Sequence, residues 1–194
     1  MATKRIVVGI SGATGPQYGI RLLQALGELG VETHLVLSKA ARRNIALESD
    51  WTPEEVERLA DVNYNFEDVG AAIASGSFLT DGMVVAPCSV KTASAIAHCY
   101  NDNLLVRAAD VTLKERRNLV VLFRETPLHK GHIDILHRLA DVGAVILPPM
   151  VAFYHRPQTV EEIVDQTVGK VLDQLKIEHN LFRRWKGADL AVVK

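Results

Sequence analysis

Cysteine is scarce in this 194-residue sequence, which contains only Cys88 and Cys99. Two cysteines cannot build a framework of disulfides, so we expect reduced thiols and a cytoplasmic protein. Long apolar runs are missing too, since none approaches the roughly 20 residues that a membrane-spanning helix needs. The first residues enter a strand without the pattern of a signal peptide. These absences predict a protein with no membrane partner.

Neither sign of charge is in excess, because 22 Lys and Arg face 23 Asp and Glu, for a formal net charge of −1. A general nucleic-acid binder usually carries a basic excess, so we expect no nucleic-acid partner. The hydrophobic fraction of 48% and the charged fraction of 23% are ordinary for a globular protein. The sequence has no repeat, low-complexity segment or shift in composition. We therefore expect a single domain over residues 1–194.

Short apolar runs alternate with amphipathic stretches along the chain. Strands are expected over Arg5–Gly9, Glu32–Leu37, Gly82–Ala86 (stopped by Pro87), Asn118–Phe123 and Ala144–Leu147. Helices are expected over Gln17–Leu29, Ser89–His98, Leu104–Glu115, His129–Val142 and Thr159 to about Leu175, and after Ser38 and Thr52. This alternation predicts an α/β fold with a doubly wound, mostly parallel sheet and helices on both faces, in a Rossmann-like arrangement.

Ligands of such sheets bind outside the carboxyl ends of the strands, and here those ends are rich in polar groups. The first strand runs into the glycine-rich turn Gly9–Gly15, whose amides can approach an anion at the start of the next helix, with Thr14 adding a hydroxyl. Ser38 follows the second strand and can serve as helix cap or phosphate ligand. For the turn Gly9–Gly15, the alternative is a tight turn that needs glycine for its geometry alone. The turn lacks dinucleotide spacing and the lysine of a P-loop, but its position favours a nucleotide phosphate.

Two further strand ends carry candidate groups. The loop Ser89–Thr92 offers two hydroxyls, a lysine and the amides of a helix start, although a capped helix with a surface lysine gives the same pattern. Cys88 beside it has no evident base partner, so we interpret it as a small buried hydrophobic residue. At the next strand end, Arg124 can clamp a phosphate and Glu125 can move a proton. An exposed pair of these two residues with no role is the alternative.

A metal site is not expected. His129 and His132 lie three apart on a predicted helix, but no further ligand set accompanies them, and the chain has no aspartate-rich pair of the kind that holds magnesium on a diphosphate. The loop around Tyr154 and His155 follows the Pro148–Pro149 break. It is either a ligand contact or a surface loop with an aromatic anchor.

These segments, taken together and in order over nearly the whole chain, closely resemble the flavin prenyltransferases, the UbiX-like family. That family includes the small partner proteins of phenolic-acid and hydroxyarylic-acid decarboxylases. The similar segments are GISGATG from Gly9, THLVLSKAAR, LESD, SGSFLTDGMVVAPCSVKT, LLVRAADVTLKERR, RETPL, GAVILPPMVAFYHRP, QTVGKVLDQ and RRWKG. Departures are small: Thr14 stands where some members have serine, and Lys170 where some have arginine. Both keep the hydroxyl or the charge.

The resemblance implies a metal-independent prenyltransferase that moves a dimethylallyl group from dimethylallyl phosphate to N5 and C6 of reduced FMN. FMN is then a substrate, and prenylated FMN is supplied to a partner decarboxylase. The resemblance implies FMN contacts by Gly12, Ala13, Thr14, Ser38, Ser89, Val90, Lys91, Thr92 and Arg124. It implies a prenyl-phosphate site with Lys114, Arg124, Tyr154 and Lys170, acid/base roles for Glu48 and Glu125, and shelter of the allyl group by Trp185. It also implies a homo-oligomer, a dodecamer, with sites at subunit contacts.

Other functions fit parts of the pattern. An FMN-dependent decarboxylase of the related homo-oligomeric flavoprotein group shares the fold but has no need of Lys114, Tyr154 and Lys170. A decarboxylase subunit would need a distinct aromatic-acid site, which the sequence does not offer. A flavodoxin-like carrier would bind FMN without chemistry, and the acid/base pair at the sheet edge argues against it.

Overall fold

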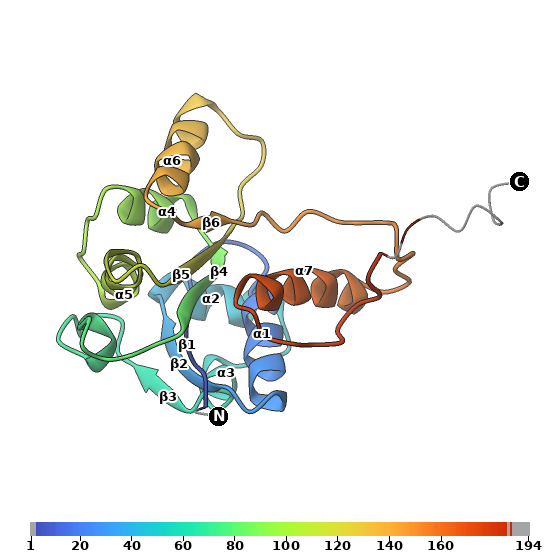
Figure 1. Ribbon diagram of the computed structural model, residues 1–194, viewed down its shortest axis with the longest axis horizontal. Coiled ribbons are helices and arrows are strands. Elements are labelled where there is room, and N and C mark those ends of the chain that lie inside the picture. The colour runs from blue at the N-terminus through green and yellow to red at the C-terminus, as the bar shows by residue number, and fades with distance from the viewer. Residues whose placement is uncertain (1–2, 186, 188–194) are drawn as a thin grey trace, which may run out of the picture.

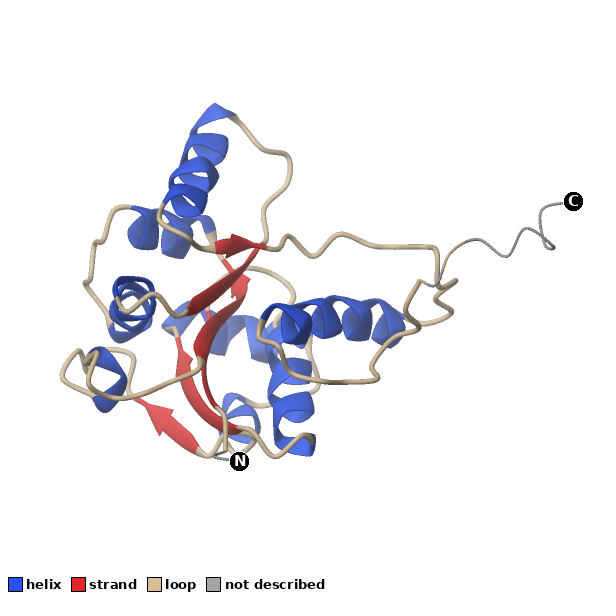
Figure 2. Ribbon diagram, viewed as in Figure 1, coloured by secondary structure: helices blue, strands red, loops and turns tan. Residues whose placement is uncertain are grey.

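The computed structural model describes residues 3–185 and 187, and it is built on one parallel sheet (Figures 1 and 2). Its strands are β1 (Arg5–Ile10), β2 (Glu32–Leu37), β3 (Val62–Tyr64), β4 (Gly82–Cys88), β5 (Asn118–Phe123) and β6 (Val145–Ile146). They lie in the order β3-β2-β1-β4-β5-β6, and neighbouring strands all pair parallel. The order reverses at β1 and β4, so the ligand crevice of this doubly wound sheet lies at their carboxyl ends.

Helices cover both faces because side chains alternate along each buried strand. Ile6 and Val8 of β1 belong to one core cluster, and Val7 belongs to the other. The first cluster packs under α1 (Gln17–Glu28), α2 (Lys39–Glu48), α3 (Pro53–Glu57) and α7 (Val160–Gln174). The second packs under the short 3₁₀ helix Ala72–Ala74 and helices α4 (Val90–Ala97), α5 (Leu104–Lys114) and α6 (Lys130–Asp141). The predicted α/β fold with helices on both faces is confirmed.

Two details differ from the sequence-based expectation. Strand β3 was not predicted, because three half-buried or exposed residues give too short a pattern to detect. The expectation that Pro87 stops the third strand was wrong: β4 continues through Pro87 to Cys88. The register between β4 and β5 shifts between Val85 and Cys88, and such an irregularity accommodates a residue that lacks a backbone N–H.

The chain leaves the sheet after β6 in a long connection that runs out to the start of α7, and the C-terminal segment approaches the far end of this connection (Figure 1). Met150 and Phe153 on the connection are 75% and 73% exposed. We call residues 148–158 the arm. Among the described residues, no helix is long and apolar enough to cross a membrane.

The packing of α1 on the sheet gives a matched pair of test substitutions. A Cβ atom at Gly19 would lie 2.4 Å from the Ala86 carbonyl oxygen and 2.6 Å from Ile10 Cδ1, whereas at Gly27 it would meet nothing within 4 Å. Gly19→Ala should therefore push α1 off β4 and lower the free energy of unfolding by about 1–3 kcal/mol. Gly27→Ala should leave it unchanged or raise it by up to about 1 kcal/mol. Urea denaturation of both variants measures this, and equal midpoints would contradict the packing.

Candidate active site

Backbone hydrogen bonds tie the ends of four strands into one corner. The Ser38 N–H after β2 donates to the Ile10 carbonyl at 3.1 Å. The Ser11 N–H donates to the Pro87 carbonyl at 3.2 Å, and the Arg124 N–H donates to the Cys88 carbonyl at 3.0 Å. The loops after β1, β2, β4 and β5 therefore form a single surface, which we call the corner.

Ser11 is the buried polar link of the corner, and the sequence analysis did not single it out. Its hydroxyl donates to the Pro87 carbonyl at 3.0 Å and accepts from the Ser89 N–H at 2.8 Å. One side chain thus fixes the glycine-rich turn against the loop that opens α4. A serine directly after an apolar strand was the available signal, because a buried hydroxyl must find partners.

The glycine-rich turn lies against α2 and against the carboxylate at the end of that helix. A Cβ atom at Gly12 would be 2.4 Å from Ala40 Cβ, so only glycine allows this approach. Glu48 Oε2 accepts from the Thr14 hydroxyl at 2.7 Å and from the Gly15 N–H at 2.8 Å. The structure therefore brings Glu48 to the turn, 34 positions beyond Thr14.

The starts of two helices point at this corner. Ser38 caps α2 by accepting from the Ala41 N–H at 3.0 Å. Ser89 caps α4 by accepting from the Thr92 N–H at 3.3 Å, and its hydroxyl lies 3.1 Å from the Thr92 hydroxyl oxygen. Helix N-termini carry partial positive charge and attract anions. The corner thus gathers the predicted binding residues Gly12, Ala13, Thr14, Ser38, Ser89, Val90, Lys91, Thr92 and Arg124.

Arg124 and Glu125 add the ionisable groups of the fourth strand end. Arg124 is half-buried, whereas Glu125 is exposed and accepts from the Thr126 N–H at 3.0 Å. Tyr18 at the start of α1 is a neighbour that the sequence analysis missed. Burial raises the pKa of Tyr18, and the nearby Arg124 charge opposes that rise. An aromatic residue at a helix start is too common a pattern to have identified it.

The other predicted site residues do not join the corner within one chain. Lys114 ends α5, which leads into the start of β5, and it pairs with Glu115. It therefore lies at the amino ends of the strands, opposite the corner. Tyr154 of the arm contacts Trp185 edge to face, with ring centroids 5.9 Å apart. Lys170 lies on α7, 3.7 Å from an Asp173 oxygen. Among the described residues, no hydrogen bond or ion pair links this donor group (Lys114, Tyr154, Lys170 and Trp185) to the corner.

The histidines considered as metal ligands have a structural explanation. His129 caps α6, since its Nδ1 accepts from the Gly131 N–H at 3.0 Å. The His132 ring packs on it with centroids 3.7 Å apart. Within the described part of the chain, no three His, Cys, Asp or Glu side chains gather as a metal-binding group.

Known proteins share both the sequence and the fold. The chain matches the Flavoprotein family over residues 1–181. It is 56% identical over 188 residues to the flavin prenyltransferase UbiX of Escherichia coli strain K12, covering 95% of this chain and 100% of that protein. The chain belongs to the UbiX flavin prenyltransferases.

Solved structures agree with this membership. One described as AnUbiX (PadA1) in complex with FMN and dimethylallyl pyrophosphate superposes with a TM-score of 0.95 at 47% identity, covering 96% of this chain and 100% of that one. Another, described as a dodecameric FMN-dependent UbiX-like decarboxylase from Escherichia coli O157:H7, gives 0.92 at 49% identity, covering 94% and 100%. Relatives 50–56% identical to the chain are flavin prenyltransferases, so the decarboxylase alternative is not favoured. The chain is a flavoprotein and a transferase.

Cys88 is not available as a nucleophile. It is 0% exposed, and burial raises the pKa of its thiol far above the usual range. The attacking form of cysteine is the thiolate, which burial disfavours. The interpretation of Cys88 as a small hydrophobic residue is consistent with this burial.

Alkylation tests the difference between the two cysteines. Cys99 is exposed, so iodoacetamide at pH 8 should modify the folded protein once, and a Cys99→Ser variant should stay unmodified. Mass spectrometry counts the adducts, and denatured protein, which should take two, is the control. Modification of folded Cys99→Ser at a comparable rate would show that Cys88 is reactive.

Proposed function

We propose that this chain, as one flavin-binding domain over residues 1–194, transfers a dimethylallyl group from dimethylallyl phosphate to reduced FMN. The product, prenylated FMN, is passed to a partner decarboxylase, and the enzyme works in the cytoplasm without a metal ion. The observation that carries the proposal is the corner, where helix starts, Arg124 and two carboxylates surround a glycine-rich turn. The AnUbiX neighbour, described with FMN and dimethylallyl pyrophosphate, supports a site that holds FMN beside a phosphorylated dimethylallyl donor.

The corner fits the phosphate and ring system of FMN. Ser38, Ser89 and Thr92 supply hydroxyls at helix starts, and Lys91 and Arg124 supply positive charge. Gly12 packs on Ala40 with no room for a Cβ atom, which brings the turn close to the start of α2. Ala13 and Val90 are the further FMN contacts of the proposal.

The donor group supplies what a departing phosphate needs. Breaking the allylic C–O bond builds negative charge on the phosphate, which Lys114, Lys170 and Arg124 would stabilise, with a hydrogen bond donated by the Tyr154 hydroxyl. The positive charge on the allyl fragment would be sheltered by the aromatic face of Trp185. Holding the prenyl carbon at near-attack distance would be the main contribution of binding.

Carboxylates at the corner handle the protons. When bound, reduced FMN supplies the N5 and C6 atoms to which the prenyl unit becomes attached. Attachment at N5 releases the N5 proton, and ring closure at C6 adds one proton to the prenyl double bond and releases the proton of C6. Glu125, at the exposed side of the corner, would accept the C6 proton. Glu48, fixed by the Thr14 hydroxyl and the Gly15 N–H, is the second acid/base group.

An anaerobic mixture of the protein, reduced FMN and dimethylallyl monophosphate tests the proposal. The flavin should gain the mass of one dimethylallyl substituent, and parallel reactions with the diphosphate identify the preferred donor. Glu125→Gln should bind FMN as tightly as the wild type yet form prenylated flavin at least about a hundredfold more slowly, because the proton acceptor is lost. A flavin of unchanged mass would rule out the transfer, and normal turnover by Glu125→Gln would rule out the role of that glutamate.

We further propose that the enzyme is a homo-oligomer, a dodecamer, in which neighbouring subunits complete each site. Lys114 lies at the amino ends of the strands, opposite the corner of its own chain. A Lys114 side chain from a second subunit would therefore complete the site at the flavin. The arm leaves Met150 and Phe153 in water, and such apolar groups favour burial at an interface. The neighbour described as dodecameric supports this assembly.

Mixed oligomers test the sharing of sites. Lys114→Ala and Glu125→Gln should each be nearly inactive alone, but dissociated and reassembled together they should regain about a quarter of the wild-type activity, because some sites receive both native residues. A mixture of Arg124→Ala and Glu125→Gln is the control, since both residues come from one corner. If activity did not recover in the first mixture, Lys114 and Glu125 of each active site would come from the same chain, and the proposed sharing of sites would be wrong.

A further inference from the structure

Asp173, near the end of α7, is the centre of a charged cluster that lies away from the corner. Its carboxylate accepts from Arg184 through both oxygens, at 2.7 and 3.1 Å. His179 Nε2 lies 3.1 Å from Asp173 Oδ1, the oxygen that accepts the shorter bond from Arg184. Lys170 Nζ lies 3.7 Å from Asp173 Oδ2. One carboxylate therefore contacts three basic side chains from α7 and from the segment that follows it.

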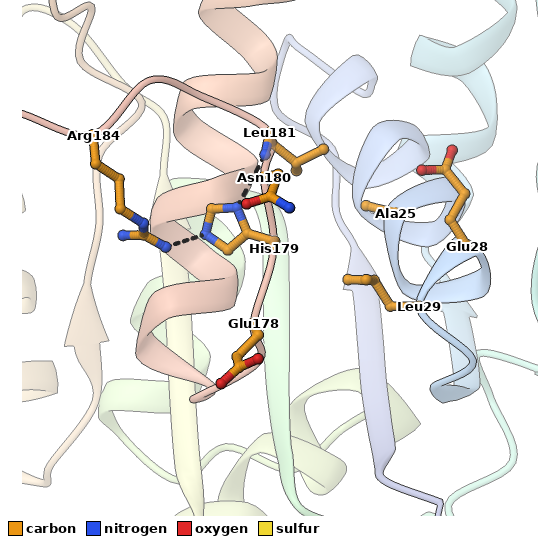
Figure 3. A pocket seen from close by; sticks show the side chains of 8 residues that line it. All are labelled: Ala25, Glu28, Leu29, Glu178, His179, Asn180, Leu181 and Arg184. Atoms are coloured by element: carbon orange, nitrogen blue, oxygen red, sulfur yellow. Dashed lines mark hydrogen bonds between the residues drawn. The ribbon is translucent and has the colours of Figure 1, made fainter.

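His179 contributes a further donor to the same carboxylate. Its side chain is only 1% exposed, and its Nδ1 accepts from the Leu181 N–H at 3.3 Å, so the ring proton is on Nε2 and points at Asp173. Arg184 Nη2 approaches to 3.2 Å from Nε2 (Figure 3), and both donors converge on the same carboxylate oxygen. Hydrogen bonds from Arg184 above all, and from His179, lower the pKa of Asp173 and thus stabilise its charged form.

The segment of residues 177–185, which we call the C-terminal strap, is attached to α7 rather than to α1. A cavity of about 690 Å³ lies between the strap and α1, lined by Ala25, Glu28, Leu29, Glu178, His179, Asn180, Leu181 and Arg184 (Figure 3). On the α7 side there is no gap, because a Cβ atom at Gly169 would lie 2.5 Å from the Phe182 ring and 2.6 Å from His179 Cε1. Asp173 is the polar anchor of that contact.

The strap carries Trp185 directly after Arg184. The Trp185 ring meets Tyr154 of the arm with centroids 5.9 Å apart and planes at 76°. Lys170 lies three residues before Asp173 on the same helix. Lys170 therefore lies beside the Asp173 carboxylate, and Trp185, with Tyr154 packed on it, is connected to the same carboxylate through the adjacent Arg184.

We propose that Asp173 is a positioning residue of the prenyl-donor site, which holds the strap on α7 through Arg184 and His179 so that Trp185 packs on Tyr154. The same carboxylate orients Lys170. It acts through these residues and does not touch the flavin or the donor. The inference rests on the proposed function, since it concerns how the prenyl donor is held.

Asp173→Asn tests the inference. The loss of a charged acceptor should release Arg184 and the strap, and the KM for dimethylallyl monophosphate should rise about tenfold or more. The FMN dissociation constant, measured by flavin fluorescence, should stay unchanged, because the corner uses other elements. The emission of Trp185, taken as the difference from a matching Trp185→Phe variant, should shift toward that of a solvent-exposed indole.

Asp165→Asn is the matched control. Asp165 lies on the same helix, pairs with Arg21 at 2.7 Å and has a side chain 27% exposed, against 22% for Asp173. Removing this ion pair alters α7 without touching the strap, so both the donor KM and the Trp185 emission should stay at wild-type values. If the two substitutions changed the donor KM and the Trp185 emission equally, Asp173 would act only by stabilising the helix, and the proposal would be wrong.

A second variant covers the case in which Asp173→Asn does not fold. Arg184→Gln removes the same ion pair from an exposed position and should also raise the donor KM. Combining it with Trp185→Phe should add little, because both changes act on one contact. A wild-type protein that makes no prenylated flavin would refute the proposed function. An active wild type with a normal donor KM in Asp173→Asn, or in Arg184→Gln where the first variant does not fold, would refute the role of Asp173 alone.

Discussion

Parallel pairing on both sides of β1 is the constraint on which the site depends. Because β2 and β4 run in the same direction as β1, the carboxyl ends of the three strands lie side by side. The strand order reverses between β1 and β4, so the helices after these two strands cover opposite faces of the sheet and leave a crevice between them. The Ser11 hydroxyl then locks the β1 and β4 loops together through Pro87 and Ser89. Four loops spread over more than a hundred positions thus become neighbours, although they are far apart from one another in sequence.

Local chemistry made much of this predictable. The helix starts at Ser38, Thr52, Ser89 and Thr159 were predicted from the sequence, because a side-chain oxygen that caps a helix acts within three residues. The strand ends followed from apolar runs bounded by glycine or polar residues. Contacts across the chain were beyond such reasoning: nothing local in Thr14 or Glu48 indicates that the two side chains meet.

The contacts within the donor group could not be predicted from local sequence either. Its residues were carried over by resemblance, and no spacing rule would have joined Tyr154 of the arm to Trp185 of the strap. Asp173 was not singled out either, since a carboxylate in the last turn of a helix pattern is ordinary. Its importance comes from the strap folding back on α7, where the absence of a side chain at Gly169 makes room for Phe182 and His179.

The arm has a consequence for the single subunit. Met150 and Phe153 project from a connection that has little of the chain's own core beneath it. In a single subunit these side chains face water, and exposed apolar groups of this kind favour contact with unrelated surfaces. In the proposed oligomer, copies of the chain would cover them, so the lifetime of a free subunit would depend on the protein concentration.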